Sequence, residues 1–150
     1  MTTLKLLVTG GMGFIGCNFI RYTLTKYDEI QITNLDKLSM GSNPANLKDL
    51  EADKRYKFVK GDIGEKKLVE NLVNNADAVV NIAAETHVDR SIAEPWPFVR
   101  SNTAGAVSLF EATKKQGKRV LHVSTDEIYG DIIQGSFKED DKLKPSSPYS

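Results

Sequence analysis

The chain has 150 residues, of which 40% are hydrophobic and 27% charged, a composition typical of one globular domain with a buried core. Twenty basic and twenty acidic residues cancel, and no run rich in lysine or arginine is present, which argues against nucleic acid or an anionic membrane as the main partner. With one cysteine, Cys17, and no apolar stretch long enough for a signal peptide or a membrane span, we expect a cytoplasmic protein that binds a small molecule.

The first apolar run, Leu4–Val8, leads into the sequence T-G-G-M-G-F-I-G and a helix predicted over Gly13–Lys26. A buried strand, a glycine-rich turn and a helix in this order form a pyrophosphate site, because backbone N–H groups and the positive end of the helix dipole face the ligand. Gly10 is expected to form the tight turn, Gly13 to allow close approach of the ligand, and Gly16 to let the helix pack closely on the strand.

A second apolar run, Ile30–Leu35, ends at Asp36, about twenty residues after Gly16, where dinucleotide sites place an acid. A carboxylate here accepts hydrogen bonds from the ribose hydroxyls and repels a 2′-phosphate, which indicates NAD rather than NADP. The neighbouring Lys37 weakens that preference slightly. One alternative for Asp36 is an ordinary turn aspartate. A P-loop is disfavoured because no G-K-[ST] sequence follows the glycines.

The remaining apolar runs and the segments between them predict strands at Tyr56–Val59, Ala78–Ile82 and Val120–Val123, helices at Glu65–Asn74 and about Pro97–Gln116, and a short helix within Asn43–Leu50. This alternation of strands and helices predicts an α/β fold, a Rossmann-type doubly wound parallel sheet with helices on both faces. The continuous apolar character of the runs predicts that the strands are buried on both faces. Residues 131–150 are polar, rich in proline and serine, and predict a loop.

Ligands of this architecture bind at the carboxyl ends of the strands, so the residues after each run are candidates. After the third strand, Asp62 and Ile63 offer a carboxylate and an apolar side chain where an adenine ring could lie, although G-D-I also suits a plain turn. After the fourth strand comes A-A-E-T-H-V-D-R-S-I, in which the small pair Ala83 and Ala84 would allow a ligand close to the backbone.

Within that segment we interpret His87 as a structural histidine and Asp89 with Arg90 as a surface ion pair. After the fifth strand, S-T-D-E-I-Y-G sets the carboxylates of Asp126 and Glu127 side by side. Neighbouring acids in different surroundings can serve as general acid and general base, and a solvated acidic turn explains them equally well.

Taken together, T-G-G-M-G-F-I-G, L-D-K-L, G-D-I, A-A-E-T-H-V-D-R-S-I, S-T-D-E-I-Y-G and the closing P-S-S-P-Y-S, in this order and spacing, resemble the extended short-chain dehydrogenases/reductases, and among these the dTDP-glucose 4,6-dehydratases. The resemblance runs from Leu4 to Ser150. Sugar-nucleotide epimerases of the same superfamily usually carry S-S-A-T-x-Y-G in place of S-T-D-E-I-Y-G, and so lack the acid pair.

The resemblance implies an internal redox cycle that converts dTDP-glucose to dTDP-4-keto-6-deoxyglucose with tightly held NAD. Tyr149 resembles the base that takes the proton of the sugar's 4-hydroxyl, and Thr125 would hydrogen-bond that hydroxyl. Glu127 resembles the base that removes the proton on the fifth carbon, and Asp126 resembles the acid that protonates the departing 6-hydroxyl.

The resemblance also implies the binding residues. The expected NAD contacts are Gly10, Gly13, Phe14, Ile15, Gly16, Asp36, Lys37, Asp62, Ile63, Ile82, Ala83, Ala84 and Ser101. Thr86 and Thr125 are the expected contacts of the nucleotide sugar. No metal site is expected, and the full-length form is expected to be a homodimer.

One part of the family pattern lies outside the chain. The family motif is Y-x-x-x-K, and its lysine would follow Tyr149 at position 153, beyond Ser150. We therefore expect residues 1–150 to be a truncated NAD-binding Rossmann domain without its nucleotide-sugar-binding part, which binds NAD weakly and does not turn over dTDP-glucose. The alternatives are a UDP-sugar dehydratase, epimerase or decarboxylase of the same superfamily, and a non-catalytic NAD-binding module.

Overall fold

The computed structural model describes residues 3–150, and a five-stranded sheet with the strand order β3–β2–β1–β4–β5 forms its centre. The strands are β1 (Leu4–Thr9), β2 (Ile30–Asp36), β3 (Tyr56–Lys60), β4 (Ala78–Asn81) and β5 (Arg119–His122). Every neighbouring pair is parallel. The chain moves outward from β1 to β3 and then returns to the other side of β1 for β4 and β5. This arrangement confirms the predicted Rossmann-type sheet, in which ligands bind where the strand order reverses.

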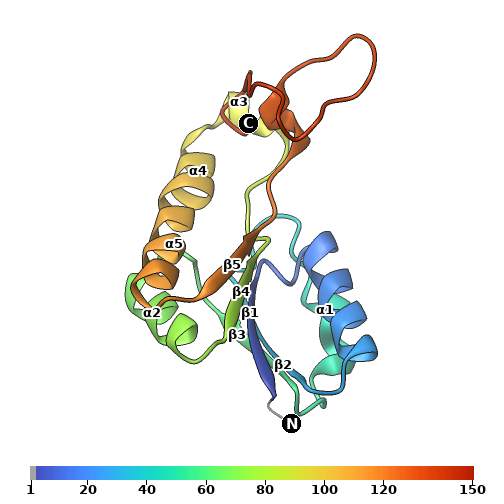
Figure 1. The fold of residues 1–150 in the computed structure, drawn as a ribbon, viewed down its shortest axis with the longest axis vertical. Coiled ribbons are helices and arrows are strands. Elements are labelled where there is room, and N and C mark those ends of the chain that lie inside the picture. Colours follow the sequence, from blue (N-terminus) through green and yellow to red (C-terminus); the bar gives the residue numbers. More distant parts are fainter. Residues whose placement is uncertain (1–2) are drawn as a thin grey trace.

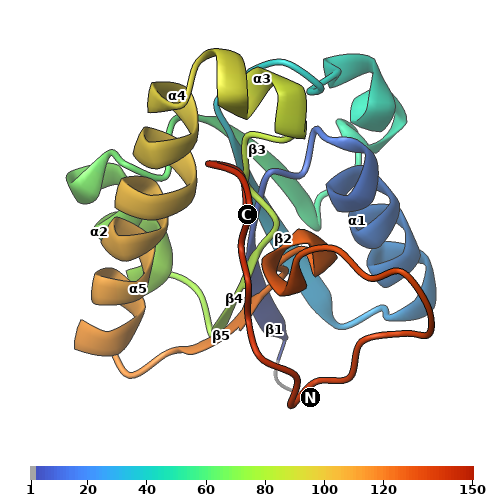
Figure 2. The ribbon, with the colours of Figure 1, turned by 90° about the horizontal axis from the view of Figure 1, so that it is seen from above.

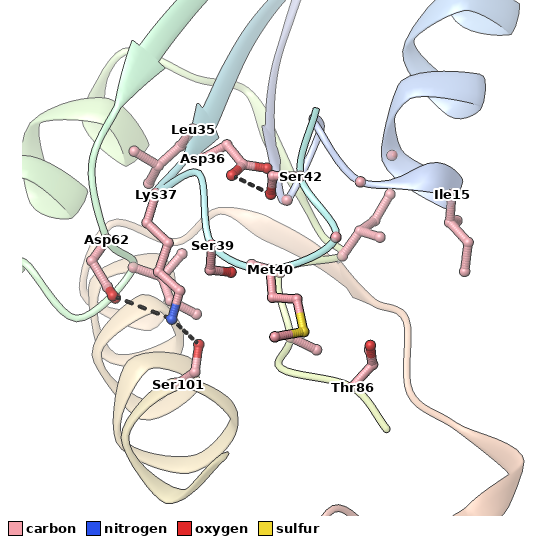
Figure 3. A pocket seen from close by; sticks show the side chains of 18 of the residues that line it. Ile15, Leu35, Asp36, Lys37, Ser39, Met40, Ser42, Asp62, Thr86 and Ser101 are labelled. Carbon is pink, nitrogen blue, oxygen red and sulfur yellow. Dashed lines mark hydrogen bonds and ion pairs between the residues drawn. The ribbon is translucent and has the colours of Figure 1, made fainter. Parts of the chain in front are cut away.

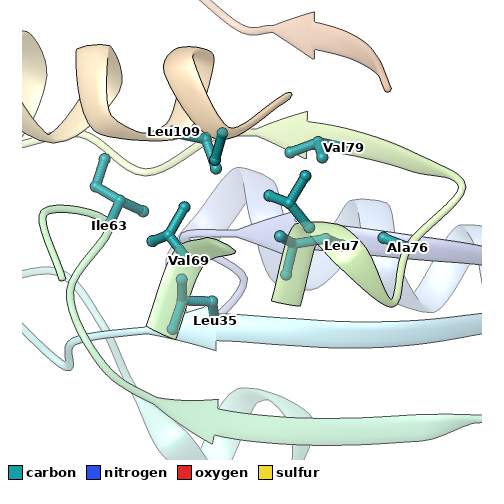
Figure 4. Close-up of a cluster of buried hydrophobic side chains, with 9 residues drawn as sticks. Leu7, Leu35, Ile63, Val69, Ala76, Val79 and Leu109 are labelled. Atoms are coloured by element: carbon teal, nitrogen blue, oxygen red, sulfur yellow. The ribbon is translucent and has the colours of Figure 1, made fainter. Parts of the chain in front are cut away.

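Helices cover both faces of the sheet, as predicted (Figures 1 and 2). Helix α1 (Phe14–Lys26) lies against one face, and α2 (Lys66–Asn74) and α5 (Ala106–Lys115) pack together against the other. Adjacent residues of a strand point to opposite faces. On β1, Leu7 therefore belongs to the cluster between the sheet and α2 and α5 (Figure 4), and Val8 belongs to the cluster beneath α1. The continuous apolar runs of the inner strands thus reflect burial on both faces.

The fifth strand differs from the prediction. All four residues of β5 are exposed, and Leu121 remains 58% accessible. The prediction of burial on both faces is wrong for this strand because β5 is the edge strand beside β4, and within residues 3–150 no strand pairs with its outer side. The apolar side chains of Val120 and Leu121 are 42% and 58% accessible, so within residues 3–150 they are only partly covered.

The predicted helix at Pro97–Gln116 forms three consecutive segments. Helix α4 (Trp96–Phe98) passes into a π-helical stretch, η2 (Val99–Gly105), and then into α5. Asn43–Leu50 contains a 3₁₀ helix, η1 (Pro44–Leu50), whose first turn is capped by the Asn43 side chain accepting the Ala45 N–H at 3.0 Å.

Two short helices were not predicted: α3 (Val88–Ala93) and the 3₁₀ helix η3 (Asp126–Tyr129). Each is too short to show a helical period in the sequence. Residues 131–150 contain no helix or strand, as predicted. Within residues 3–150, the structure contains no helix with both the length and the apolar character needed to cross a membrane.

Candidate functional site

A cavity of about 370 Å³ opens at the carboxyl ends of the strands (Figure 3). Its walls come from the glycine-rich turn after β1, the end of β2 with the turn that follows it, the segment after β3, the segment after β4, and Ser101 of η2. Every residue expected to contact NAD lines this cavity, and so does Thr86. Residues far apart in the sequence therefore meet at one place, although their proposed roles stay a prediction.

Three of the four glycines of the turn, Gly10, Gly13 and Gly16, have different surroundings. Gly10 has φ +73°, and a Cβ there would lie 2.6 Å from the backbone nitrogen of Ala83. A Cβ at Gly16 would collide with the carbonyl oxygen of Gly10. Gly13 has φ −77°, and its Cβ would meet only the Gly10 oxygen, at 3.4 Å. The fold itself therefore requires Gly10 and Gly16, whereas Gly13 faces open cavity.

A buried polar network supports the turn from below. Asn34, which is fully buried in β2, accepts the Gly11 N–H through Oδ1 at 3.1 Å and donates through Nδ2 to the Tyr56 hydroxyl at 2.9 Å. Burial raises the pKa of Tyr56, and the hydrogen bond with Asn34 partly opposes that shift. Sequence reasoning missed Asn34; the available signal was an amide inside an otherwise apolar strand.

A second buried polar chain joins three strands near their carboxyl ends. The Thr9 hydroxyl donates to Asn81 Oδ1 at 2.5 Å, and Asn81 Nδ2 lies 2.9 Å from Nδ1 of His122. Asn81 is fully buried. These contacts link β1, β4 and β5 immediately before the segments that carry the candidate ligand-binding residues. The sequence analysis missed this network too.

Asp36 ends β2 and is buried. Its Oδ2 accepts the Met12 N–H at 2.9 Å, and its Oδ1 accepts the Leu38 N–H at 2.8 Å and the Ser42 hydroxyl at 2.9 Å. A carboxylate offers about four acceptor positions, so three protein donors orient it and leave room for a further donor. The Ser42 hydroxyl is the most readily moved of the three, because it rotates about one bond and belongs to a turn that lines the cavity.

Lys37 turns its ammonium group away from Asp36, toward the far wall of the cavity (Figure 3). Its Nζ lies 2.9 Å from Glu85 Oε1, 3.2 Å from the Ser101 hydroxyl and 3.7 Å from Asp62 Oδ2. Glu85 is 5% exposed. The side chain of Lys37 thus joins the segments after β2, β3 and β4 with helix η2.

The prediction of a surface ion pair between Asp89 and Arg90 is wrong, because Arg90 pairs with Glu85 instead. Its guanidinium nitrogen Nη2 lies 3.5 Å from Glu85 Oε2, and its Cζ lies 5.7 Å from the centre of the Phe98 ring. No ion pair between Asp89 and Arg90 forms in residues 3–150. Arg90 lies in the short helix α3, which directs its side chain toward the buried carboxylate of Glu85. The sequence analysis did not predict this helix.

The candidate catalytic residues lie outside the cavity lining. Thr125 caps η3 by accepting the Glu127 N–H at 3.3 Å. Asp126 is exposed and Glu127 is half-buried. Tyr149 is half-buried, with its ring edge-on to Phe98 at 6.2 Å between ring centres. Figure 1 shows η3 and the chain end above the carboxyl ends of the strands, the same end of the molecule as the cavity.

Sequence reasoning also missed part of the lining. The additional residues are Leu35, Ser39, Met40, Gly41, Ser42, Gly61 and His87. The turn from Ser39 to Ser42 directly follows the expected ribose-binding segment, and its polar residues and Gly41 were the available signal. His87, interpreted above as structural, is exposed and lines the cavity with φ +83°.

Comparison with known proteins gives consistent matches. A family model described as GDP-mannose 4,6 dehydratase matches residues 7–150. The low-salt glycan biosynthesis protein Agl12 of Haloferax volcanii is 47% identical over 98% of this chain and 47% of its own length. A dTDP-glucose 4,6-dehydratase of Actinoplanes sp. is 46% identical over 98% of this chain and 48% of its own length.

Among solved structures, the dTDP-glucose 4,6-dehydratase DesIV of Streptomyces venezuelae, with NAD and TYD bound, is 44% identical with a TM-score of 0.92. The match covers 97% of this chain and 47% of DesIV. The chain thus spans about half the length of the curated relatives it matches.

Proposed function

The chain belongs to the family described as GDP-mannose 4,6 dehydratase, and we propose that the protein dehydrates dTDP-glucose to dTDP-4-keto-6-deoxyglucose with NAD as an internal redox carrier. The relatives named dTDP-glucose 4,6-dehydratase support this substrate within the family. The adjacent acids Asp126 and Glu127 support dehydration over epimerisation. We further propose that residues 1–150 form the cofactor-binding domain of this enzyme.

The observation that carries the proposal is the open space at Gly13. Nothing in residues 3–150 prevents a side chain there, because its backbone conformation suits any residue and its one near neighbour lies at 3.4 Å. Gly10 and Gly16, by contrast, are required by the surrounding backbone. A glycine that the fold does not require, between a phosphate-binding turn and a helix N-terminus, fits close approach by a pyrophosphate.

The other cavity residues fit the rest of the dinucleotide. The oriented carboxylate of Asp36 would accept hydrogen bonds from the hydroxyls of the adenosine ribose. Asp62 and Ile63 would hold the adenine ring, and the small side chains of Ala83 and Ala84 would leave room beside β4 for the rest of the dinucleotide. When bound, NAD supplies the group that takes a hydride from the fourth carbon of the sugar and returns it at the sixth.

The proposed proton steps fall to four residues of this chain. Tyr149 takes the proton of the 4-hydroxyl, which Thr125 holds by a hydrogen bond. The resulting 4-ketone acidifies the proton on the fifth carbon, and Glu127 removes it. Asp126 protonates the 6-hydroxyl as it leaves as water.

Product analysis tests the proposal. The protein, as its source produces it, is incubated with NAD and either dTDP-glucose or UDP-glucose, and the products are identified by mass spectrometry and NMR. We expect dTDP-glucose to lose one water and to yield the 4-keto-6-deoxy sugar. An epimer that keeps its water, or conversion of UDP-glucose in preference, would contradict the proposal.

Two variants separate the steps. Glu127→Gln should still oxidise the sugar, seen as the absorbance of reduced NAD, but should form product at least about a hundredfold more slowly, because the base for elimination is lost. Tyr149→Phe should reduce both signals. Glu139→Gln, at an exposed carboxylate in the loop after β5, is the control and should leave both unchanged. Equal loss of both signals in Glu127→Gln would remove Glu127 from the elimination step.

A further inference from the structure

Four charged side chains from separate segments meet beside the cavity, and two of them, Lys37 and Asp62, line it. They are Lys37 after β2, Asp62 after β3, Glu85 after β4 and Arg90 of α3. Glu85 is the buried centre of the group. One of its oxygens contacts Lys37 at 2.9 Å, and the other faces Arg90 at 3.5 Å.

The backbone of Glu85 is held as firmly as its side chain. Asn102 of η2 accepts the Glu85 N–H at 2.8 Å through Oδ1 and donates to the Glu85 carbonyl oxygen at 2.9 Å through Nδ2. The Asn102 side chain hydrogen-bonds both backbone polar groups of Glu85, whose carboxylate lies between Lys37 and Arg90. Glu85 therefore has little freedom to move. The partly exposed Lys37 side chain is therefore the mobile partner, and Glu85 is the fixed one.

The position of the Lys37 ammonium group bears on the choice between NAD and NADP. Lys37 directly follows Asp36, the expected ribose-binding carboxylate, and it is the one lysine or arginine among the residues that line the cavity. A cation free to approach the ribose would attract a 2′-phosphate and partly cancel the repulsion from Asp36. In the structure the Lys37 ammonium points instead at Asp62 and Ser101 (Figure 3). Its Nζ also lies 2.9 Å from Oε1 of Glu85.

We propose that Glu85 is a positioning residue for cofactor specificity: it holds the Lys37 ammonium away from the adenosine ribose and so keeps the site selective for NAD over NADP. This inference rests on the proposed NAD site. On this proposal Lys37 does not weaken the preference for NAD, in contrast to the expectation from the sequence, because carboxylates of the protein already neutralise its ammonium group.

The test measures binding by calorimetry, with the protein as its source produces it, stripped of bound nucleotide. Dissociation constants for NAD and NADP are determined for the wild type and for Glu85→Gln. We expect the ratio of the NADP constant to the NAD constant to fall about fivefold in Glu85→Gln, the size expected for a partly exposed ion pair. Glu70→Gln, which removes an exposed carboxylate of α2 that lies 3.2 Å from Nζ of Lys115 in α5, is the matched control and should leave the ratio unchanged.

Lys37→Met tests the same claim at the partly exposed partner of the ion pair. Because the ammonium is already held away from the ribose, this variant should change the ratio by less than about twofold, and Glu85→Gln with Lys37→Met should restore the wild-type ratio. A larger rise of the ratio in Lys37→Met alone would overturn the proposal, even if Glu85→Gln failed to fold. An unchanged ratio in folded Glu85→Gln would also overturn it.

The two levels of the proposal fail in different ways. A wild type that binds NAD and rejects NADP, with a ratio insensitive to Glu85, would remove the role of Glu85 and keep the NAD site. A wild type that binds neither nucleotide would overturn both.

Discussion

At the level of single residues, some glycines of the turn are required by the fold, and Gly13 is expected to be required by the ligand. Gly13→Ala should leave the free energy of unfolding unchanged or raise it by up to about 1 kcal/mol, because the backbone conformation suits alanine. NAD affinity should fall at least about tenfold, since the added methyl enters the expected pyrophosphate site. Urea denaturation and calorimetry measure the two quantities.

Gly16→Ala is the matched comparison within the same turn. It should lower the free energy of unfolding by about 1–3 kcal/mol or more, because the new methyl would collide with the backbone at Gly10. If Gly13→Ala proved as destabilising as Gly16→Ala, or left NAD binding untouched, the assignment of Gly13 to the ligand would be wrong.

The Asn34–Tyr56 pair makes a pH-dependent prediction. Tyr56→Phe should destabilise the protein by about 1–3 kcal/mol near neutral pH, because the buried amide of Asn34 loses its acceptor. Burial raises the pKa of Tyr56 in the folded state above its unfolded value of about 10. The stability contributed by the neutral phenol is therefore complete below about pH 10 and is lost as pH rises through the folded pKa.

The difference between wild type and Tyr56→Phe should consequently shrink above about pH 10, since phenylalanine does not titrate. Urea midpoints of both proteins across the alkaline range measure this difference. A difference that stayed constant to about pH 11 would show that Tyr56 does not contribute to the alkaline loss of stability.

At the scale of elements, the layer formed by α2 and α5 holds one face of the sheet. Leu109 of α5 is fully buried against Leu7, Val69 and Val79 (Figure 4). Leu109→Ala should lower the free energy of unfolding by about 2–5 kcal/mol, because it leaves a cavity in a packed core. Chemical denaturation measures the loss.

Lys114→Ala, on the exposed side of the same helix, is the control and should change stability by less than about 0.5 kcal/mol. A similar effect from both variants would mean that the burial of Leu109 does not govern the contribution of α5.

At the scale of the whole molecule, the structure supports a prediction about residues 1–150 as an isolated polypeptide. Within residues 3–150 the four residues of β5 are exposed, and Tyr149 lies outside the lining of the cavity. We expect this polypeptide to bind NAD weakly and not to convert dTDP-glucose, whereas the protein as its source produces it should do both. Calorimetry and product analysis distinguish them, and conversion by residues 1–150 would contradict the prediction.

The amino-acid sequence was sufficient to predict the elements of the fold and most of the residues that line the cavity. Apolar runs identified all five strands, and the runs of β1 and β4 showed burial on both faces because alternate side chains of a strand serve two different cores. The spacing of Gly10, Gly13 and Gly16, with Asp36 after the next strand, located the turn that the cavity faces. These are local patterns, and the backbone translates them directly into structure.

Which distant groups meet could not be predicted from local patterns and depends on the packing of the whole chain. The fixed Glu85 beside Lys37, the support of the glycine turn by Asn34, and the pairing of Arg90 with Glu85 rather than Asp89 join segments that no local pattern relates. The exposure of β5 likewise depends on its place at the edge of the sheet, not on its own apolar residues. Such contacts arise from the packing of whole elements, because the partners of a side chain depend on where other parts of the chain fold.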